Sequence, residues 1–131
     1  MSNLVLIEPY LIGLVQGSFQ SNGMPMPYVQ EIFLLECHIA GTSYLDLKDL
    51  EPSLLINDLL IMKREPENKH DEHAILILTQ KGERLGFIPR EKNEVIAHLM
   101  DAGKIIFGKI IEKKWHGNWL KMMIQIYLRE L

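Results

Sequence analysis

Side chains that can bind an ion or take part in proton transfer are most densely clustered in one short segment of this sequence. Residues 63–73 read KREPENKHDEH, so polar or titratable side chains fill every position except Pro66. The runs on either side, Leu59–Met62 and Ala74–Leu78, are short and rich in branched side chains, which is typical of buried strands. We therefore predict a polar loop beside the core, which is either a binding site or a solvated connection.

Strand geometry argues against two reactive arrangements. His70 and His73 lie three apart in or next to a strand, so we expect their side chains to face apart and form no closed tetrahedral zinc site. Cys37 and His38 are adjacent and also face apart, which defeats a Cys–His nucleophile pair. There is no Walker sequence and no G-x-S-x-G elbow. We expect a protein that is not an enzyme and needs no cofactor or metal, and a metalloenzyme with its metal near His70 is the remaining catalytic alternative.

Length and cysteine content favour a single domain in a reducing compartment. The chain of 131 residues fits one compact domain. Its one cysteine, Cys37, excludes an internal disulfide framework, which fits a cytoplasmic location. Residues 1–28 are predicted to be an apolar extension ahead of a domain at 29–131. The extension has no basic region at its start and is interrupted by Glu8 and Pro9, so we expect neither export nor membrane insertion.

The charge is unevenly distributed along the chain. The net charge of −3 argues against strong sequence-independent binding to polyphosphate. One basic residue and seven acidic residues precede Ile61, whereas 13 basic and 10 acidic residues follow from there. The second half can therefore present a modest anion-binding face.

The apolar pattern predicts strands with a helix inserted late in the chain. Val95, Ile96, Leu99 and Met100 are expected on one face of a helix that begins after Pro89. A first short helix is expected at Tyr10–Val15, and a helical turn from Asp46 to Leu50. The predicted strands are 29–39, with Phe33, Leu35, Cys37 and Ile39 on one face, then 59–63, 73–79, 84–88, 104–113 and 119–128. The predicted fold is mainly β with two short helices (α+β), a small six-stranded OB-like, partly open barrel.

Three segments together resemble the HIRAN domain. They are HIAGTSYL at 38–45, KREPENKHDEHAILI at 63–77 and LGFIPREKNEVIAHLMD at 85–101. The resemblance covers roughly Glu31 to Leu128 and includes the long pattern R-E-P-x-N-x-x-D-x-x-A-I followed by G-F-I-P-R. It implies a module that binds single-stranded DNA, captures its 3′-hydroxyl end and serves DNA repair.

The resemblance also assigns roles to individual residues. Tyr44 matches the aromatic that stacks on an unpaired base, and Asp71 matches the acid that accepts the proton of the terminal hydroxyl. Arg90 matches a phosphate-binding cation at a helix start. The predicted nucleic-acid site comprises Ser43, Tyr44, Asn68, His70, Asp71, Phe87 as a pocket wall, Arg90 and Trp119.

Departures from the family pattern keep a rival function open. Ser43 stands where DNA-end binders carry arginine, Leu45 replaces a second aromatic, and His70 replaces an aromatic before the aspartate. The rival is a protein-interaction or oligomerisation module that has lost DNA-end binding and self-associates through residues 1–28.

Several of these residues also have a purely structural interpretation. Asn68 and Asp71 can tie the loop by bonding to backbone N–H groups. Tyr44 can be ordinary barrel packing, and Trp119 can pack against its neighbours across the sheet. Arg64 is expected to form a structural ion pair with Glu65, Glu67 or Asp71.

Overall fold

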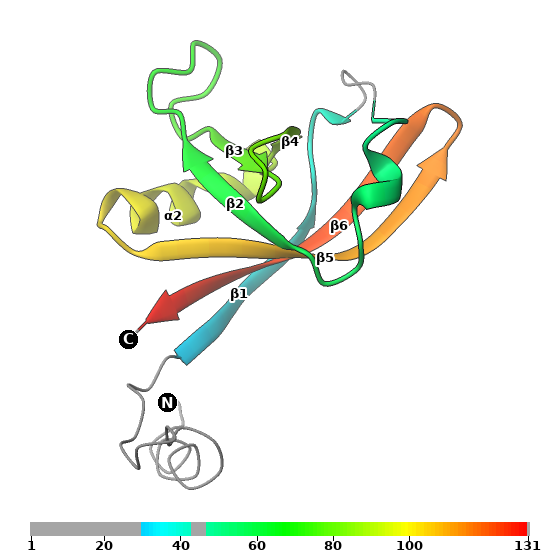
Figure 1. The fold of residues 1–131 in the computed structure, drawn as a ribbon. Coiled ribbons are helices and arrows are strands. Elements are labelled where there is room, and N and C mark those ends of the chain that lie inside the picture. The colour runs from blue at the N-terminus through cyan, green and yellow to red at the C-terminus, as the bar shows by residue number, and fades with distance from the viewer. Residues whose placement is uncertain (1–29, 43–46, 131) are drawn as a thin grey trace, which may run out of the picture. The chain divides into compact units, whose positions relative to one another are not determined.

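The computed structural model describes residues 30–42 and 47–130. Within the chain, Glu31–Arg129 form one compact unit. The elements in chain order are β1 (Gln30–His38), the 3-10 helix η2 (Glu51–Ser53), β2 (Leu59–Arg64), β3 (Ile75–Leu78), β4 (Arg84–Phe87), α2 (Arg90–Asp101), β5 (Ile105–His116) and β6 (Trp119–Glu130) (Figure 1).

The strands form one six-stranded sheet in the order β1-β6-β5-β2-β3-β4. The long antiparallel hairpin of β5 and β6 runs from the Ile105–Arg129 pair to the His116–Trp119 pair. β2 pairs antiparallel with both β5 and β3. The sheet is a half-barrel. The prediction of a mainly β domain with six strands is therefore confirmed.

An isolated bridge joins the two ends of this strand order. Just after β1, Ala40 exchanges two backbone hydrogen bonds of 2.8 Å with Phe87 of β4. Gly86 makes this approach possible because its φ is +149°, and a Cβ there would lie 2.3 Å from the Ala40 carbonyl oxygen. Any side chain at this position would push the two segments apart.

Alternating residues of the long hairpin fill the core. On β6, Leu120, Met122 and Ile124 are buried, as are Ile126 and Leu128, which confirms the period-2 pattern of the sequence. β1 differs from the prediction because Leu34 and Leu35 both pack against the core. The alternation of faces therefore shifts between these two residues, and Phe33, expected inside, is 51% exposed.

The helical predictions are partly wrong. Of the described residues, only 90–101 form an α-helix; the predicted helix at Tyr10–Val15 lies outside them. After Leu47 the chain makes turns and then the 3-10 helix, with Pro52 in its first turn, where its missing N–H is tolerated. On α2, Val95 is 67% exposed and Asn93, Ile96 and Ala97 form the buried face.

No helix within the described ranges is long and apolar enough to cross a membrane.

Candidate nucleic-acid interface

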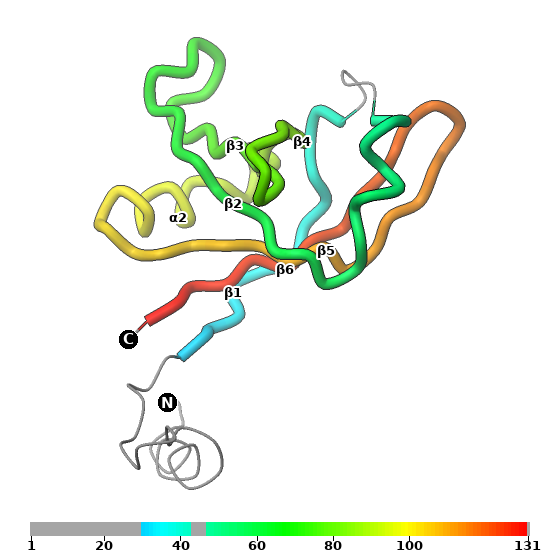
Figure 2. Tube along the Cα trace, viewed as in Figure 1, coloured from blue at the N-terminus to red at the C-terminus, as the bar shows by residue number. Residues whose placement is uncertain are grey.

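Asn68 organises the polar loop between β2 and β3. Its side-chain oxygen accepts hydrogen bonds from the backbone N–H of His70 at 2.8 Å and of Asp71 at 3.2 Å. Its amide nitrogen donates to Glu65 Oε1 at 3.2 Å. The loop extends beyond the ends of the two strands that it joins (Figure 2). Asn68 therefore holds the backbone that carries His70 and Asp71, as its structural interpretation predicted.

Asp71 is held by groups on both sides of its carboxylate. Oδ1 accepts a 2.9 Å hydrogen bond from the His73 backbone N–H, and Oδ2 accepts a 2.7 Å bond from the side-chain amide of Asn93. Arg90 Nε lies 3.8 Å from Oδ2. The side chain is 19% exposed, so a ligand can reach a carboxylate whose orientation is already fixed.

These contacts also set the charge of Asp71. Partial burial works to raise the pKa of the carboxyl group, because it disfavours the charged form. The hydrogen bonds from the His73 backbone and Asn93, with the charge of Arg90, outweigh burial and hold the pKa below its usual range. Asp71 is therefore an anion at neutral pH, and it can act as a hydrogen-bond acceptor but not as a donor.

Asn93 is the one member of this cluster that the sequence interpretation did not select. It is 2% exposed and lies on the buried face of α2 with Ile96 and Ala97. A buried amide requires a hydrogen-bond partner, and Asp71 supplies it. The sequence contained one indication of this role. Asn93 lies three positions before Ile96 and four before Ala97, so the three side chains share one face of the helix.

Arg90 lies at the first position of α2 and reaches back to the loop. Its guanidinium donates to the carbonyl oxygen of His70, yet its side chain remains 69% exposed. Pro89 precedes it, and no side chain caps the helix start. In this first turn the Lys92 N–H donates to the Pro89 carbonyl oxygen at 2.9 Å. First-turn N–H groups that have no such partner are available to water or to an anion. We call Asn68, His70, Asp71 and Arg90, together with Asn93, the Asp71 cluster.

Arg64 has a structural role, as predicted, but with a different partner. It forms two hydrogen bonds with the Asp101 carboxylate, at 2.9 and 3.2 Å, instead of pairing with an acid of its own loop. The same guanidinium donates to the carbonyl oxygens of Glu72 and Ala74. The bonds from Arg64 to Asp101 hold the pKa of that carboxyl group below its usual range. Together, the four bonds of Arg64 tie the loop end to the last turn of α2.

The remaining predicted residues are not part of the Asp71 cluster. Ser43 and Tyr44 lie outside the described residues. Trp119 Nε1 donates a 2.6 Å hydrogen bond to the hydroxyl of buried Thr42, so the indole anchors the chain directly before Ser43. Phe87 is half-buried and pairs with Ala40, three residues ahead of Arg90.

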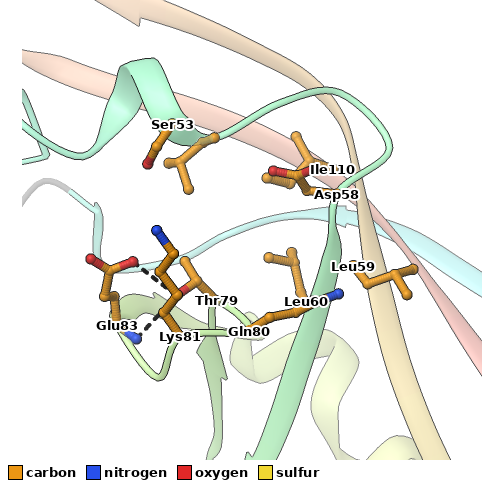
Figure 3. Close-up of a pocket in the computed structure, with 10 residues that line it drawn as sticks. Ser53, Asp58, Leu59, Leu60, Thr79, Gln80, Lys81, Glu83 and Ile110 are labelled. Atoms are coloured by element: carbon orange, nitrogen blue, oxygen red, sulfur yellow. Dashed lines mark hydrogen bonds between the residues drawn. The ribbon is translucent and has the colours of Figure 1, made fainter.

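A pocket of about 200 Å³ lies elsewhere, between the residues that follow η2 and the turn joining β3 to β4 (Figure 3). In that turn, Thr79 and Glu83 are joined by two 3.1 Å hydrogen bonds. The pocket is lined by Ser53, Leu54, Asp58–Leu60, Thr79–Lys81, Glu83 and Ile110. No residue of the predicted nucleic-acid site contributes to this lining.

Solved structures show the same fold at low sequence identity. A protein from Lactobacillus plantarum aligns with a TM-score of 0.72 and 23% identity over 79% of this chain and all of that one. The HIRAN domain of human HLTF aligns with a TM-score of 0.59 and 20% identity over 76% of this chain and 78% of that one. An NMR structure of the HLTF HIRAN domain in its DNA-bound conformation aligns with a TM-score of 0.54 and 19% identity over 76% and 79% of the two chains.

Sequence comparison gives a partial relative and a family. A Fanconi-associated nuclease 1 homolog of Arabidopsis thaliana is 31% identical over 67 residues, which are 51% of this chain but 7% of that protein. The chain thus corresponds to a small part of this curated relative. The sequence model of the HIRAN domain matches residues 32–130, nearly the whole described sheet and helix. The chain belongs to the HIRAN domain family.

Proposed function

We propose that this domain binds single-stranded DNA and accepts the 3′-hydroxyl of a chain end at Asp71. The observation that carries the proposal is the fixed, ionised Asp71 carboxylate, which is accessible to solvent and lies beside an exposed arginine at a helix start. The solved HIRAN domain of HLTF in a DNA-bound conformation supports DNA as the ligand. The proposed module acts by binding and catalyses no reaction.

The carboxylate has unused acceptor capacity. An ionised carboxylate offers about four lone-pair positions, and Asp71 accepts one protein hydrogen bond at each of its two oxygens. A terminal hydroxyl can therefore donate to the remaining positions. A 3′-phosphate has no such donor and brings negative charge against Asp71. A hydrogen bond to a charged group contributes about 1.5 to 3 kcal/mol, which corresponds to roughly 10- to 100-fold in affinity.

Arg90 and the start of α2 are the proposed contact for the neighbouring phosphate. The exposed guanidinium supplies charge, and the uncapped first turn supplies backbone N–H groups. The net charge of the chain is −3. We therefore expect modest affinity that falls as the salt concentration rises.

The segment after Thr42 is the proposed stacking surface. In this proposal Tyr44 stacks on the terminal base, a contact worth about 1 to 3 kcal/mol, and Ser43 lies beside the backbone. Trp119 Nε1 donates to the Thr42 hydroxyl, and its ring is a secondary candidate for stacking on a base. Phe87, which pairs with Ala40 and precedes Arg90 by three residues, is the proposed pocket wall.

Fluorescence anisotropy tests the proposal. Labelled single strands that end in a 3′-hydroxyl or a 3′-phosphate are titrated with the full chain at low and moderate salt. We expect the hydroxyl strand to bind roughly 10- to 100-fold more tightly, and Asp71→Asn to remove that preference. Asp49→Asn is the control, because Asp49 is an exposed acid outside the Asp71 cluster.

Each outcome of this titration has a defined meaning. Equal binding of both strands by the wild type contradicts recognition of the chain end but leaves single-strand binding. A preference that survives Asp71→Asn assigns the hydroxyl to another residue. Absence of binding at low salt refutes the DNA proposal.

The exposed face of the sheet favours the rival, self-association. Ile61 of β2 is opposite Phe107 of β5, Phe107 is opposite Tyr127 of β6, and the Phe33 ring of β1 lies 5.8 Å from that of Tyr127. Phe33 and Ile61 are exposed, whereas Phe107 between them is 9% exposed and the Arg129 guanidinium lies over its ring. The row therefore presents apolar surface on β1 and β2, which can mark an interface. Light scattering after gel filtration tests the rival, which predicts a dimer that Phe33→Ser together with Ile61→Ser converts to a monomer.

A further inference from the structure

Three side chains that can bind a metal ion converge next to the end of the polar loop. They are His73, just before β3, and Glu94 and His98 on α2. Their ligand atoms lie within 4.8 Å of one another. Glu94 and His98 are four residues apart, which places them on the same face of the helix. We call this group the His73 cluster.

The backbone on both sides of His73 is fixed by bonds that do not involve its ring. The His73 N–H donates to Asp71, and Arg64 donates to the carbonyl oxygens of Glu72 and Ala74. Arg64 also binds Asp101 in the last turn of α2. The loop end and the helix are therefore already tied together where the three ligand atoms meet, so little backbone conformational freedom is lost on binding an ion.

The spacing within the His73 cluster leaves room for an ion. His98 Nε2 lies 3.7 Å from Glu94 Oε2, and the rings of His73 and His98 are 5.3 Å apart at 68°. A separation of 3.7 Å exceeds the usual hydrogen-bond range. Around a tetrahedral zinc ion, ligand atoms at about 2.0 to 2.2 Å from the metal lie roughly 3.3 Å from each other. Rotation of the exposed Glu94 and His98 side chains can supply this contraction.

The ligand set selects a class of metal. Two imidazole nitrogens and one carboxylate oxygen suit zinc and neighbouring divalent transition metals, whereas calcium and magnesium prefer oxygen ligands alone. Three protein ligands leave a fourth position for water. Glu72 Oε2 lies 3.7 Å from His73 Nε2 and is a further carboxylate beside the same atoms.

We propose that His73, Glu94 and His98 bind one divalent transition-metal ion, which clips the end of the polar loop to α2. The sequence led us to expect no metal site because we considered His73 together with His70, three positions earlier in the chain. The fold instead brings His73 to His98, 25 positions away. The proposal does not depend on binding of nucleic acid.

Calorimetric titration of the untagged, metal-free full chain with zinc chloride tests this proposal. We expect one zinc ion per chain and a higher unfolding temperature with zinc present. His98→Ala and Glu94→Gln should each weaken binding at least about tenfold. Both side chains are exposed, so the two variants should match the wild type in unfolding temperature without zinc.

His116→Ala is the control, because His116 is exposed on the β5–β6 hairpin and lies outside the His73 cluster. It should bind zinc like the wild type. Absence of zinc binding overturns the proposal. Binding that His98→Ala leaves unchanged, or that His116→Ala weakens equally, also overturns it, since the ion would then lie elsewhere.

Discussion

Two sets of polar side chains on helix α2 face the polar loop in different ways. In its first turn, Asn93 and Arg90 bond directly to the loop, and Asn93 lies 2.7 Å from Asp71. Glu94 and His98 of the His73 cluster follow in the same helix and approach each other to 3.7 Å, which is beyond hydrogen-bond distance. We propose that the first arrangement presents a carboxylate to a ligand hydroxyl and that the second offers lone pairs to a metal ion.

The largest expected effect comes from placing a second charge in the first arrangement. Asn93→Asp buries a carboxylate against Asp71, and two like charges cannot both stay ionised there. We expect a loss of about 3 to 5 kcal/mol in the free energy of unfolding at neutral pH, measured by urea denaturation. The loss should shrink at acidic pH as the pair takes up a proton. Asn118→Asp, on the exposed hairpin turn, should change the free energy by less than about 0.5 kcal/mol.

A smaller effect is expected from cutting the tie between the loop and the second half of α2. Arg64→Gln removes the bonds to Asp101 and to the carbonyl oxygens of Glu72 and Ala74. We expect a loss of about 2 kcal/mol, mostly from the carbonyl bonds, because an ion pair with exposed Asp101 contributes little.

Two further measurements on Arg64→Gln sharpen the comparison. The variant should bind zinc more weakly in calorimetry, because His73 is then less firmly held. The exposed Arg84→Gln is the control and should keep both stability and zinc affinity. Unchanged stability in Arg64→Gln would show that the carbonyl bonds are replaced by water at no cost.

The smallest effect is a pH dependence that belongs to Asp71. Its pKa is lower in the folded chain than the value of about 3.9 in an unfolded one. Its ionised form therefore stabilises the fold above the unfolded pKa, and this contribution is lost as the pH falls through the folded pKa. Urea denaturation from pH 7 to pH 2 should show a smaller acid-induced loss in Asp71→Asn than in the wild type. Identical pH profiles would contradict the assignment.

The sequence predicted the strands well because their signal is local. Alternation along β6 and the short branched runs of β2 and β3 mark buried strands wherever they occur in a chain. The predicted face of Phe33 is wrong because the alternation shifts between Leu34 and Leu35, and no local feature marks this shift. Val95 was placed inside for a similar reason, since its apolar character gave no sign that Asn93 takes the buried position. The OB-like topology stays a prediction.

In the candidate site, the sequence predicted only residues that belong to the HIRAN pattern. Asn68, Asp71 and Arg90 were selected from the pattern of the HIRAN domain, and the fold brings them together. The partners Asn93 and Asp101 were missed because they lie 22 and 37 positions from the residues that they bind. Contacts between residues so far apart in the chain depend on the packing of α2 beside the loop. The spacing of apolar residues predicts single helices and strands but not how they pack.

The most direct test of the proposed interface is an NMR titration of the ¹⁵N-labelled chain with a short single strand that ends in a 3′-hydroxyl. We expect the largest shift changes at the backbone amides of Asp71 and Arg90 and at the side-chain amide of Asn93. The amides of Leu60 and Gln80, which line the separate pocket, should stay unchanged. Changes confined to that pocket or to the exposed sheet face, or no changes at all, would contradict the account.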